Sequence, residues 1–75
     1  MSFIYNKYME FGKILKELRK ENNMTQVQLA LKLHVTDTAV RCWENKGNEP
    51  PYKTLCEIAK IFEVTIGQLL GVEEY

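Results

Sequence analysis

The stretch TQVQLALKLHVTDTAVRCWE, residues 25–44, decides the fold, because it reads as two short helices joined by a tight turn. Thr25 can accept a hydrogen bond from the first free amides of a helix, and Gln28 can reach back to the amide of Thr25. A second helix start follows at Thr36, directly after Leu33, His34 and Val35. Residues 25–44 therefore predict two helices held nearly perpendicular by a turn of about three to four residues.

The spacing of apolar side chains gives each of these helices one inward face. The inward residues are Leu29, Ala30 and Leu33 in the first helix, and Ala39, Val40 and Trp43 in the second. The residues left on the outward face of the second helix are Asp37, Thr38, Arg41 and Cys42. An outward face of short polar groups with one arginine is typical of the second helix of a helix-turn-helix.

Length and composition limit the class of protein. A chain of 75 residues, with 45% hydrophobic and 27% charged residues, is expected to fold as one small domain. It contains neither the roughly 20 apolar residues of a membrane span nor a secretory signal, so we expect a cytoplasmic protein without a membrane partner. Cys42 and Cys56 lack metal-site spacing, which favours reduced thiols.

The charge balance is neutral, with ten basic and ten acidic residues. A strong nucleic-acid binder usually has a basic surface, so the total charge counts against simple electrostatic binding. The cations can nevertheless share one face, while acidic residues gather late in the chain, and we expect an asymmetric field. The cations in question are Lys16, Lys20, Lys32, Arg41, Lys46 and Lys53.

Three further helices complete an all-α prediction. They are expected from about Glu10 to Asn22, from Pro51 or Tyr52 to Phe62, and from Thr65 to Gly71, where Thr65 and Gln68 form a second capping box. Residues 11–71 are expected to form the domain. Residues 1–10 are an apolar extension that either packs on the core, the favoured reading, or forms an arm that contacts a partner, and residues 72–75 are a short tail.

The chain from about Phe11 to Gly71 resembles the lambda-repressor and Cro type of helix-turn-helix, also called the xenobiotic-response-element family. The resemblance rests on motifs at fixed spacing, which are Leu18-Arg19, Met24-Thr25-Gln26, Leu29-Ala30, Leu33-x-Val35, Trp43-Glu44-Asn45, Glu49-Pro50, Leu55, Ile58-Ala59, Val64-Thr65-Ile66 and Leu69-Leu70-Gly71. It implies a five-helix DNA-binding domain. It also implies a transcriptional regulator, expected to be a repressor, that binds a palindromic operator as a dimer with its third helix in the major groove.

Two turn positions depart from the family pattern. His34 stands where the family has glycine, and we interpret it as a left-handed turn residue, with a proton-sensitive phosphate contact as the less favoured alternative. Lys46-Gly47 reverses the usual order of glycine and lysine, so Gly47 is expected to supply the left-handed end of the third helix one residue later.

The resemblance assigns roles to individual residues. Base contacts fall on Asp37, Thr38, Arg41 and Cys42, and phosphate contacts on Gln26, Thr36, Asn45, Lys46 and Lys53. Arg19 and Glu44 are expected to form an ion pair between the first and third helices. Asp37 has an alternative role as a negative charge at a helix N-terminus, and Cys42 is more simply a passive small residue than a redox sensor. Each lysine has the alternative of an ordinary surface charge.

Other functions find little support in the residues. One histidine, one serine and no glycine-rich loop give no nucleophile, metal site or cofactor site, so we expect no enzyme activity and no cofactor. The homodimer surface is expected to include Ile66, Leu69, Val72 and Tyr75. The alternative to DNA binding is a protein-interaction module on the same fold, antitoxin-like or an anti-repressor partner.

Overall fold

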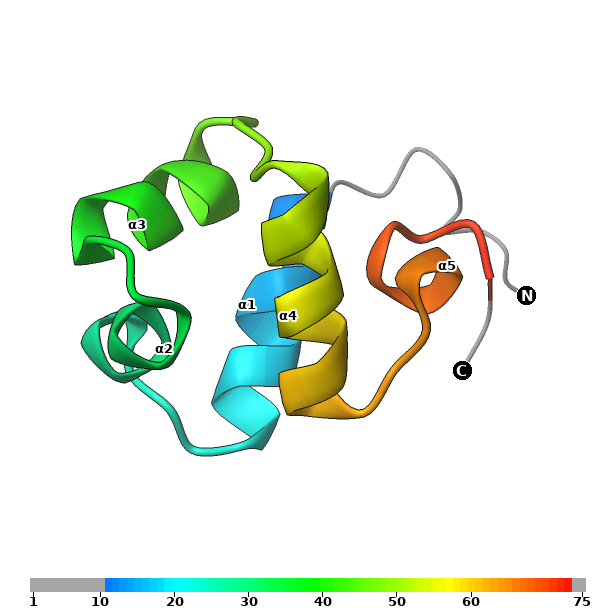
Figure 1. Ribbon diagram of the computed structural model, residues 1–75, viewed down its shortest axis with the longest axis horizontal. Helices are drawn as coiled ribbons and strands as arrows, with labels where there is room; N and C mark the ends of the chain where they lie inside the picture. The colour runs from blue at the N-terminus through cyan, green and yellow to red at the C-terminus, as the bar shows by residue number, and fades with distance from the viewer. Residues whose placement is uncertain (1–10, 74–75) are drawn as a thin grey trace.

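The computed structural model describes residues 11–73, and this part of the chain contains five α-helices and no strand, which confirms the all-α prediction. The helices are α1 (Phe11–Glu21), α2 (Gln26–Leu33), α3 (Asp37–Asn45), α4 (Tyr52–Phe62) and α5 (Ile66–Leu69). In Figure 1, α2 and α3 lie at one end of the molecule and α5 at the other. The expected role of residues 1–10, and of Glu10 as the first helical residue, falls outside the described residues.

Three threonines begin helices in the way that the sequence predicts. The hydroxyl oxygen of Thr25 accepts a hydrogen bond from the amide of Gln28 at 3.0 Å, and the Gln28 side chain accepts one from the amide of Thr25 at 2.8 Å. Thr65 and Gln68 repeat this reciprocal capping box at α5. Thr36 caps α3 by accepting from an amide one turn into the helix. These caps satisfy donors that would otherwise have no partner.

Left-handed residues end the helices and turn the chain. Asn23, His34 and Glu63 have φ angles of 57°, 59° and 58°, and Gly47 and Gly71 have 77° and 80°. The left-handed turn predicted for His34 is therefore present. Helix α3 ends at Asn45, with Lys46 as its cap and Gly47 left-handed just beyond it, as the Lys46-Gly47 order predicts.

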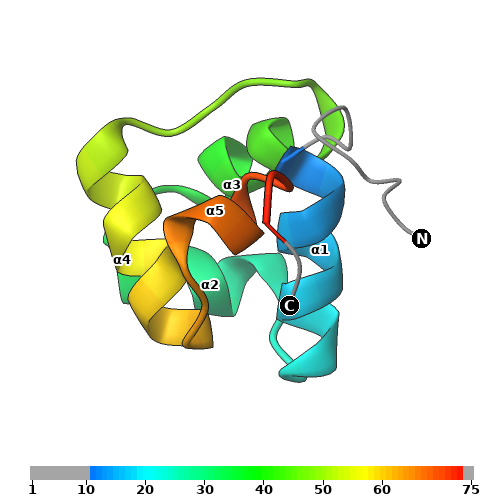
Figure 2. The same cartoon turned by 90° about the vertical axis from the view of Figure 1, so that its right-hand side faces the viewer.

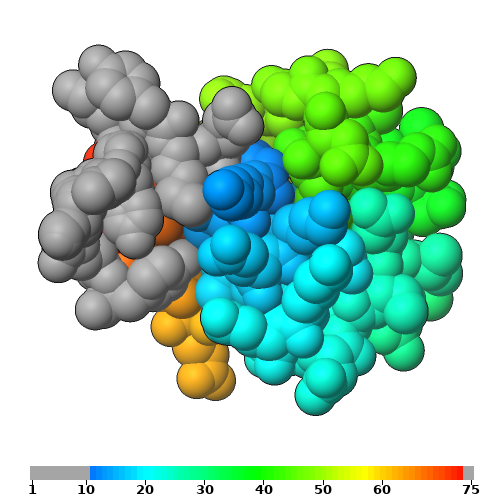
Figure 3. Space-filling view, turned by 180° about the vertical axis from the view of Figure 1, so that it is seen from behind, coloured from blue at the N-terminus to red at the C-terminus, as the bar shows by residue number. Residues whose placement is uncertain are grey.

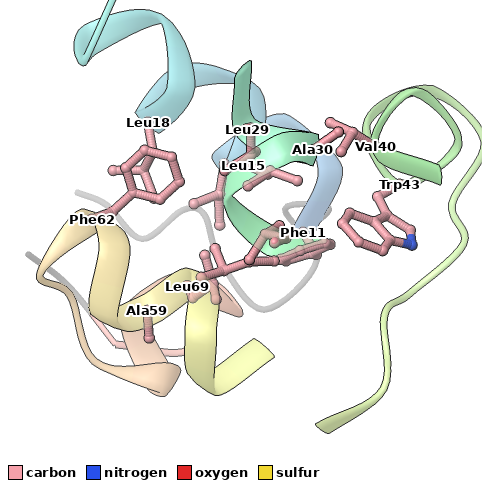
Figure 4. Close-up of a cluster of buried hydrophobic side chains, with 13 residues drawn as sticks. Phe11, Leu15, Leu18, Leu29, Ala30, Val40, Trp43, Ala59, Phe62 and Leu69 are labelled. Atoms are coloured by element: carbon pink, nitrogen blue, oxygen red, sulfur yellow. The ribbon is translucent and has the colours of Figure 1, made fainter. Parts of the chain in front are cut away.

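The core gathers apolar side chains from all five helices (Figure 4). Leu15, Leu29, Val40, Ile58 and Leu69 are fully buried. Trp43 is also buried, as predicted, and the indole ring lies beside Phe11 of α1. The turned view in Figure 2 shows α5 between α1 and α4, so the short last helix closes the end of the core that is farthest from α3.

One predicted dimer contact is wrong. Leu69 is 0% exposed and belongs to the core, because a four-residue helix turns this side chain inward between α1 and α4. Ile66 is half-buried and Val72 is 65% exposed. Tyr75 lies outside the described residues. The expected homodimer surface therefore loses Leu69.

Helix α1 approaches the end of α3 through a glycine. A Cβ atom at Gly12 would overlap the carbonyl oxygen of Trp43 and lie 2.7 Å from the carbonyl oxygen of Glu44. Any larger side chain would push the two backbones apart. Gly12 therefore sets the close contact that fixes the third helix on the first.

Candidate nucleic-acid interface

The outward face of α3 is open in the described part of the chain. Asp37, Thr38 and Arg41 are exposed, and Cys42 is half-buried. A guanidinium nitrogen of Arg41, Nη2, donates to the Thr38 hydroxyl oxygen at 3.4 Å, so these two side chains lie next to each other on the surface. The face that the sequence assigned to base contacts is therefore free to meet a ligand.

The N-terminus of α3 is the positive end of the helix dipole. Thr36 caps it, and Asp37 occupies the first turn, where a carboxylate interacts favourably with the helix dipole. The structural role proposed for Asp37 is consistent with this position. The Thr36 hydroxyl is exposed and already accepts a hydrogen bond from the helix, but its own proton remains available to donate.

The predicted phosphate contacts fall on three elements. Gln26 is the first residue of α2, Asn45 and Lys46 end α3, and Lys53 lies in the first turn of α4. All but Gln26 are exposed, and Gln26 is half-buried. Along the chain, these residues lie before, at the end of and after α3.

An aromatic hydroxyl lies beside Lys53 at the start of α4. Tyr52 is 73% exposed. A hydrogen bond with Cys56, one turn later, and the negative charge that a Cys56 thiolate carries raise the pKa of the Tyr52 hydroxyl above its ordinary value of 10.0. Tyr52 therefore remains neutral throughout the physiological pH range.

A buried ion pair connects α3 to α1. Arg19 donates from Nε to Glu44 Oε2 at 2.7 Å and from Nη2 to Glu44 Oε1 at 3.1 Å. The side chains are 9% and 0% exposed, respectively. The third guanidinium nitrogen of Arg19, Nη1, donates to the carbonyl oxygen of Met24 at 2.8 Å. The ion pair that the resemblance implies is present, and it also fixes the loop that leads into α2.

The sequence missed a second partner of the Glu44 carboxylate. Gln26 Nε2 donates to Glu44 Oε1 at 3.0 Å. Figure 3 shows the surfaces of α1, α2 and α3 adjoining one another on the side of the molecule where α1 is exposed. Arg19, Gln26 and Glu44 join these three helices. No spacing rule predicts the Gln26 contact, because the two residues are 18 positions apart and meet only through packing of α2 on α3.

The described residues contain no cluster of metal-ligating side chains. No group of three histidine, cysteine, aspartate or glutamate side chains there lies close enough to hold a metal ion. Within residues 11–73, no helix has the length and apolarity that crossing a membrane requires.

Known proteins are similar to this chain in sequence and in fold. Residues 15–69 match the family model described as Helix-turn-helix. The chain is 46% identical over 66 residues to the HTH-type transcriptional activator BcrR of Enterococcus faecalis, covering 88% of this chain and 32% of the relative. It is 40% identical over 63 residues to the uncharacterized HTH-type transcriptional regulator YqaE of Bacillus subtilis, covering 84% and 54%. The chain thus spans about a third to about half the length of these curated relatives.

The same fold occurs in the solved structures of a repressor and of an epoxidase. The P22 c2 repressor, in complex with a synthetic operator, matches with a TM-score of 0.80 and 23% identity over 87% of this chain and 98% of that one. The hydroxypropylphosphonic acid epoxidase from S. wedmorenis matches with a TM-score of 0.70 and 35% identity over 79% of this chain and 31% of that one. Together with the match over residues 15–69, these findings show that the chain belongs to the helix-turn-helix family.

Proposed function

We propose that this chain is a transcriptional regulator that binds double-stranded DNA in a sequence-specific way through α3. The observation that carries the proposal is the exposed outward face of α3 on a helix whose opposite face is buried and ion-paired. A helix held in this way can enter a major groove as a rigid body. The relatives named as HTH-type transcriptional regulators, and the similar repressor in complex with an operator, support the same function.

Base recognition is assigned to the first two turns of α3. Arg41 is placed to donate two hydrogen bonds to O6 and N7 of guanine. Thr38 can donate to a base or place its methyl group on thymine, and Asp37 can accept from the N4 amine of cytosine. Cys42, half-buried, is assigned a contact through its small side chain.

Phosphate contacts position the protein on the duplex. We assign them to Gln26, Thr36, Asn45, Lys46 and Lys53, as the resemblance implies. Because ten acidic residues balance the ten cations of the chain, binding is expected to depend on these local groups and on the helix N-termini of α2 and α3 rather than on total charge.

The proposal includes a homodimer and a cytoplasmic location. One recognition helix reads about four or five base pairs, and a two-fold dimer on a palindrome doubles that number. Ile66 and Val72 remain candidates for its surface, together with Tyr75. We propose that the chain has no catalytic role and that it represses its target. Transcription in vitro tests the direction of regulation, since one relative is named an activator.

A protein-interaction module is the second candidate. Val27 and Leu31 lie one turn apart on α2 and are 52% and 70% exposed. An exposed apolar pair at this spacing can pack against another protein. The similar fold in a chain named as an epoxidase shows that this fold occurs outside transcriptional regulators.

Selection of bound duplexes from a random DNA pool tests the two candidates. For the regulator, we expect a palindromic consensus with guanine at the position opposite Arg41, and an affinity that falls with salt at a slope of roughly −4 to −5 on logarithmic axes. The Arg41→Ala variant should relax the choice of base at that one position. Recovery of no enriched duplex, with the chain folded, would reject the regulator and favour the interaction module.

A further inference from the structure

The carboxylate of Glu44 accepts hydrogen bonds from two different helices. Oε2 accepts from Arg19, and Oε1 accepts from both Arg19 and Gln26, at 2.7, 3.1 and 3.0 Å. The Glu44 side chain is fully shielded from solvent. Because both oxygens of this buried carboxylate accept hydrogen bonds from one guanidinium, the orientation of the carboxylate is fixed. The Gln26 amide, which donates to Oε1, is therefore held in a fixed orientation as well.

Gln26 is the residue that this carboxylate orients. Its side-chain amide is planar and has two N–H donors on Nε2. One of them is directed at Glu44, so the direction of the other donor is determined by the plane of the amide. Gln26 is also the first residue of α2, where the helix N-terminus attracts an anion. Its second donor therefore extends from a positive helix end beside the last turn of α3.

We propose that Glu44 is a positioning residue that holds Gln26 ready to donate to a DNA phosphate. This inference rests on the proposed function and adds a requirement to it. Glu44 contributes to DNA affinity through Gln26, in addition to keeping α1 and α3 together. A side chain that is ordered before binding does not have to be ordered on binding, which raises affinity. A glutamine at position 26 without the hydrogen bond to Glu44 would have to be ordered on binding, which lowers affinity.

The test is a thermodynamic cycle that separates positioning from folding. The first variant, Gln26→Met, keeps the length of the side chain and removes both donors. The second, Arg19→Met with Glu44→Leu, replaces the buried ion pair by apolar groups, which commonly preserves stability where removal of one partner does not. The third combines all three substitutions. The affinity of each chain is measured for the duplex selected by the wild-type chain, and its melting temperature is recorded.

We expect Gln26→Met to weaken binding about tenfold, the effect of one hydrogen bond to a charged acceptor. The ion-pair variant should weaken binding by a similar factor, and the combined variant should bind no more weakly than either. Gln28→Met is the matched control, since it removes a glutamine of the same helix that does not reach Glu44, and it should change affinity by less than about twofold at a temperature where it is folded.

A second readout concerns the free protein. In the wild-type chain, NMR should show the Gln26 side-chain amide as ordered as the backbone, with one proton shifted by its hydrogen bond. In the ion-pair variant the amide should become mobile. If that variant is unfolded at the assay temperature, the wild-type amide alone decides: an ordered amide with a shifted proton supports the proposal, and a mobile one overturns it.

The outcomes are distinct. If Gln26→Met weakens binding by the same factor in the ion-pair variant as in the wild type, or if the amide is already mobile in the wild type, the positioning role is overturned while DNA binding stands. If the wild-type chain enriches no duplex, the proposed function fails and the inference fails with it. A single methylphosphonate that weakens the wild type and does not weaken Gln26→Met further would identify the phosphate concerned.

Discussion

The two faces of α3 differ in what holds their side chains. On the inward face, Val40 and Trp43 are buried and Glu44 is ion-paired with Arg19. On the outward face, Arg41 has only a 3.4 Å hydrogen bond to Thr38. A substitution of Val40 or Trp43 therefore acts on the free energy of unfolding, whereas one of Glu44 is proposed to act on DNA affinity as well. One on the outward face acts on ligand affinity, so specificity can change while the fold is kept.

Trp43→Ala tests the inward face most severely. It removes the largest side chain of the α1–α3 contact and leaves a cavity beside Phe11, and we expect a loss of about 3–5 kcal/mol in the free energy of unfolding. Urea denaturation followed by far-ultraviolet circular dichroism measures this loss. A loss below about 1 kcal/mol would show that the α1–α3 contact is not central to stability.

Gly12→Ala tests the close approach of α1 to the end of α3. The added methyl group meets backbone carbonyl oxygens, which cannot rotate away, so we expect a loss of about 1–3 kcal/mol. Gly67→Ala is the matched control, because the nearest atoms there belong to the side chain of Glu73, which is on the surface and can move. Equal losses in the two variants would contradict the steric explanation.

Arg41→Ala tests the outward face. We expect affinity for the selected duplex to fall by about 1–3 kcal/mol, while the free energy of unfolding changes by no more than about 0.5 kcal/mol. Fluorescence anisotropy and thermal melting of the same preparation measure the two quantities. A variant that melts much earlier than the wild type would show that Arg41 belongs to the scaffold.

Thr36→Ala has the smallest expected effect, and it tests both the stability of α3 and the DNA interface. The loss of the α3 cap should cost about 1 kcal/mol of stability. Thr36→Ser keeps the hydroxyl and should restore stability. If Thr36 also contacts a phosphate, Thr36→Ala should weaken DNA binding more than the stability loss explains, and binding equal to that of the wild type would remove Thr36 from the interface.

Local sequence rules predicted the elements well and tertiary contacts less well. The capping box at Thr25, the turn at His34 and the inward stripe at Val40 and Trp43 depend on neighbours in the chain, and all three are present in the structure. The burial of Leu69 could not be predicted in this way, because it depends on how α5 is placed between α1 and α4. The roles assigned to the exposed residues of α3 remain predictions.

The Gln26 contact shows a further limit of the sequence. Family resemblance assigned Gln26 to a phosphate and Glu44 to Arg19, as two separate roles. The structure joins them through one carboxylate, since the packing of α2 on α3 brings residues 18 positions apart to 3.0 Å. Distance in the chain carries no information about such a contact.

Besides Asn23, a residue type that tolerates the left-handed region, two residues with side chains end helices of this domain in that region. His34 and Glu63 adopt left-handed backbone angles, which cost a residue with a Cβ atom roughly 1–2 kcal/mol relative to the right-handed region, and glycine pays no such cost. Both positions lie on the surface and away from the core. Substitution of His34 or Glu63 by glycine is therefore expected to raise the melting temperature of the domain. Neither substitution changes a residue of the recognition helix.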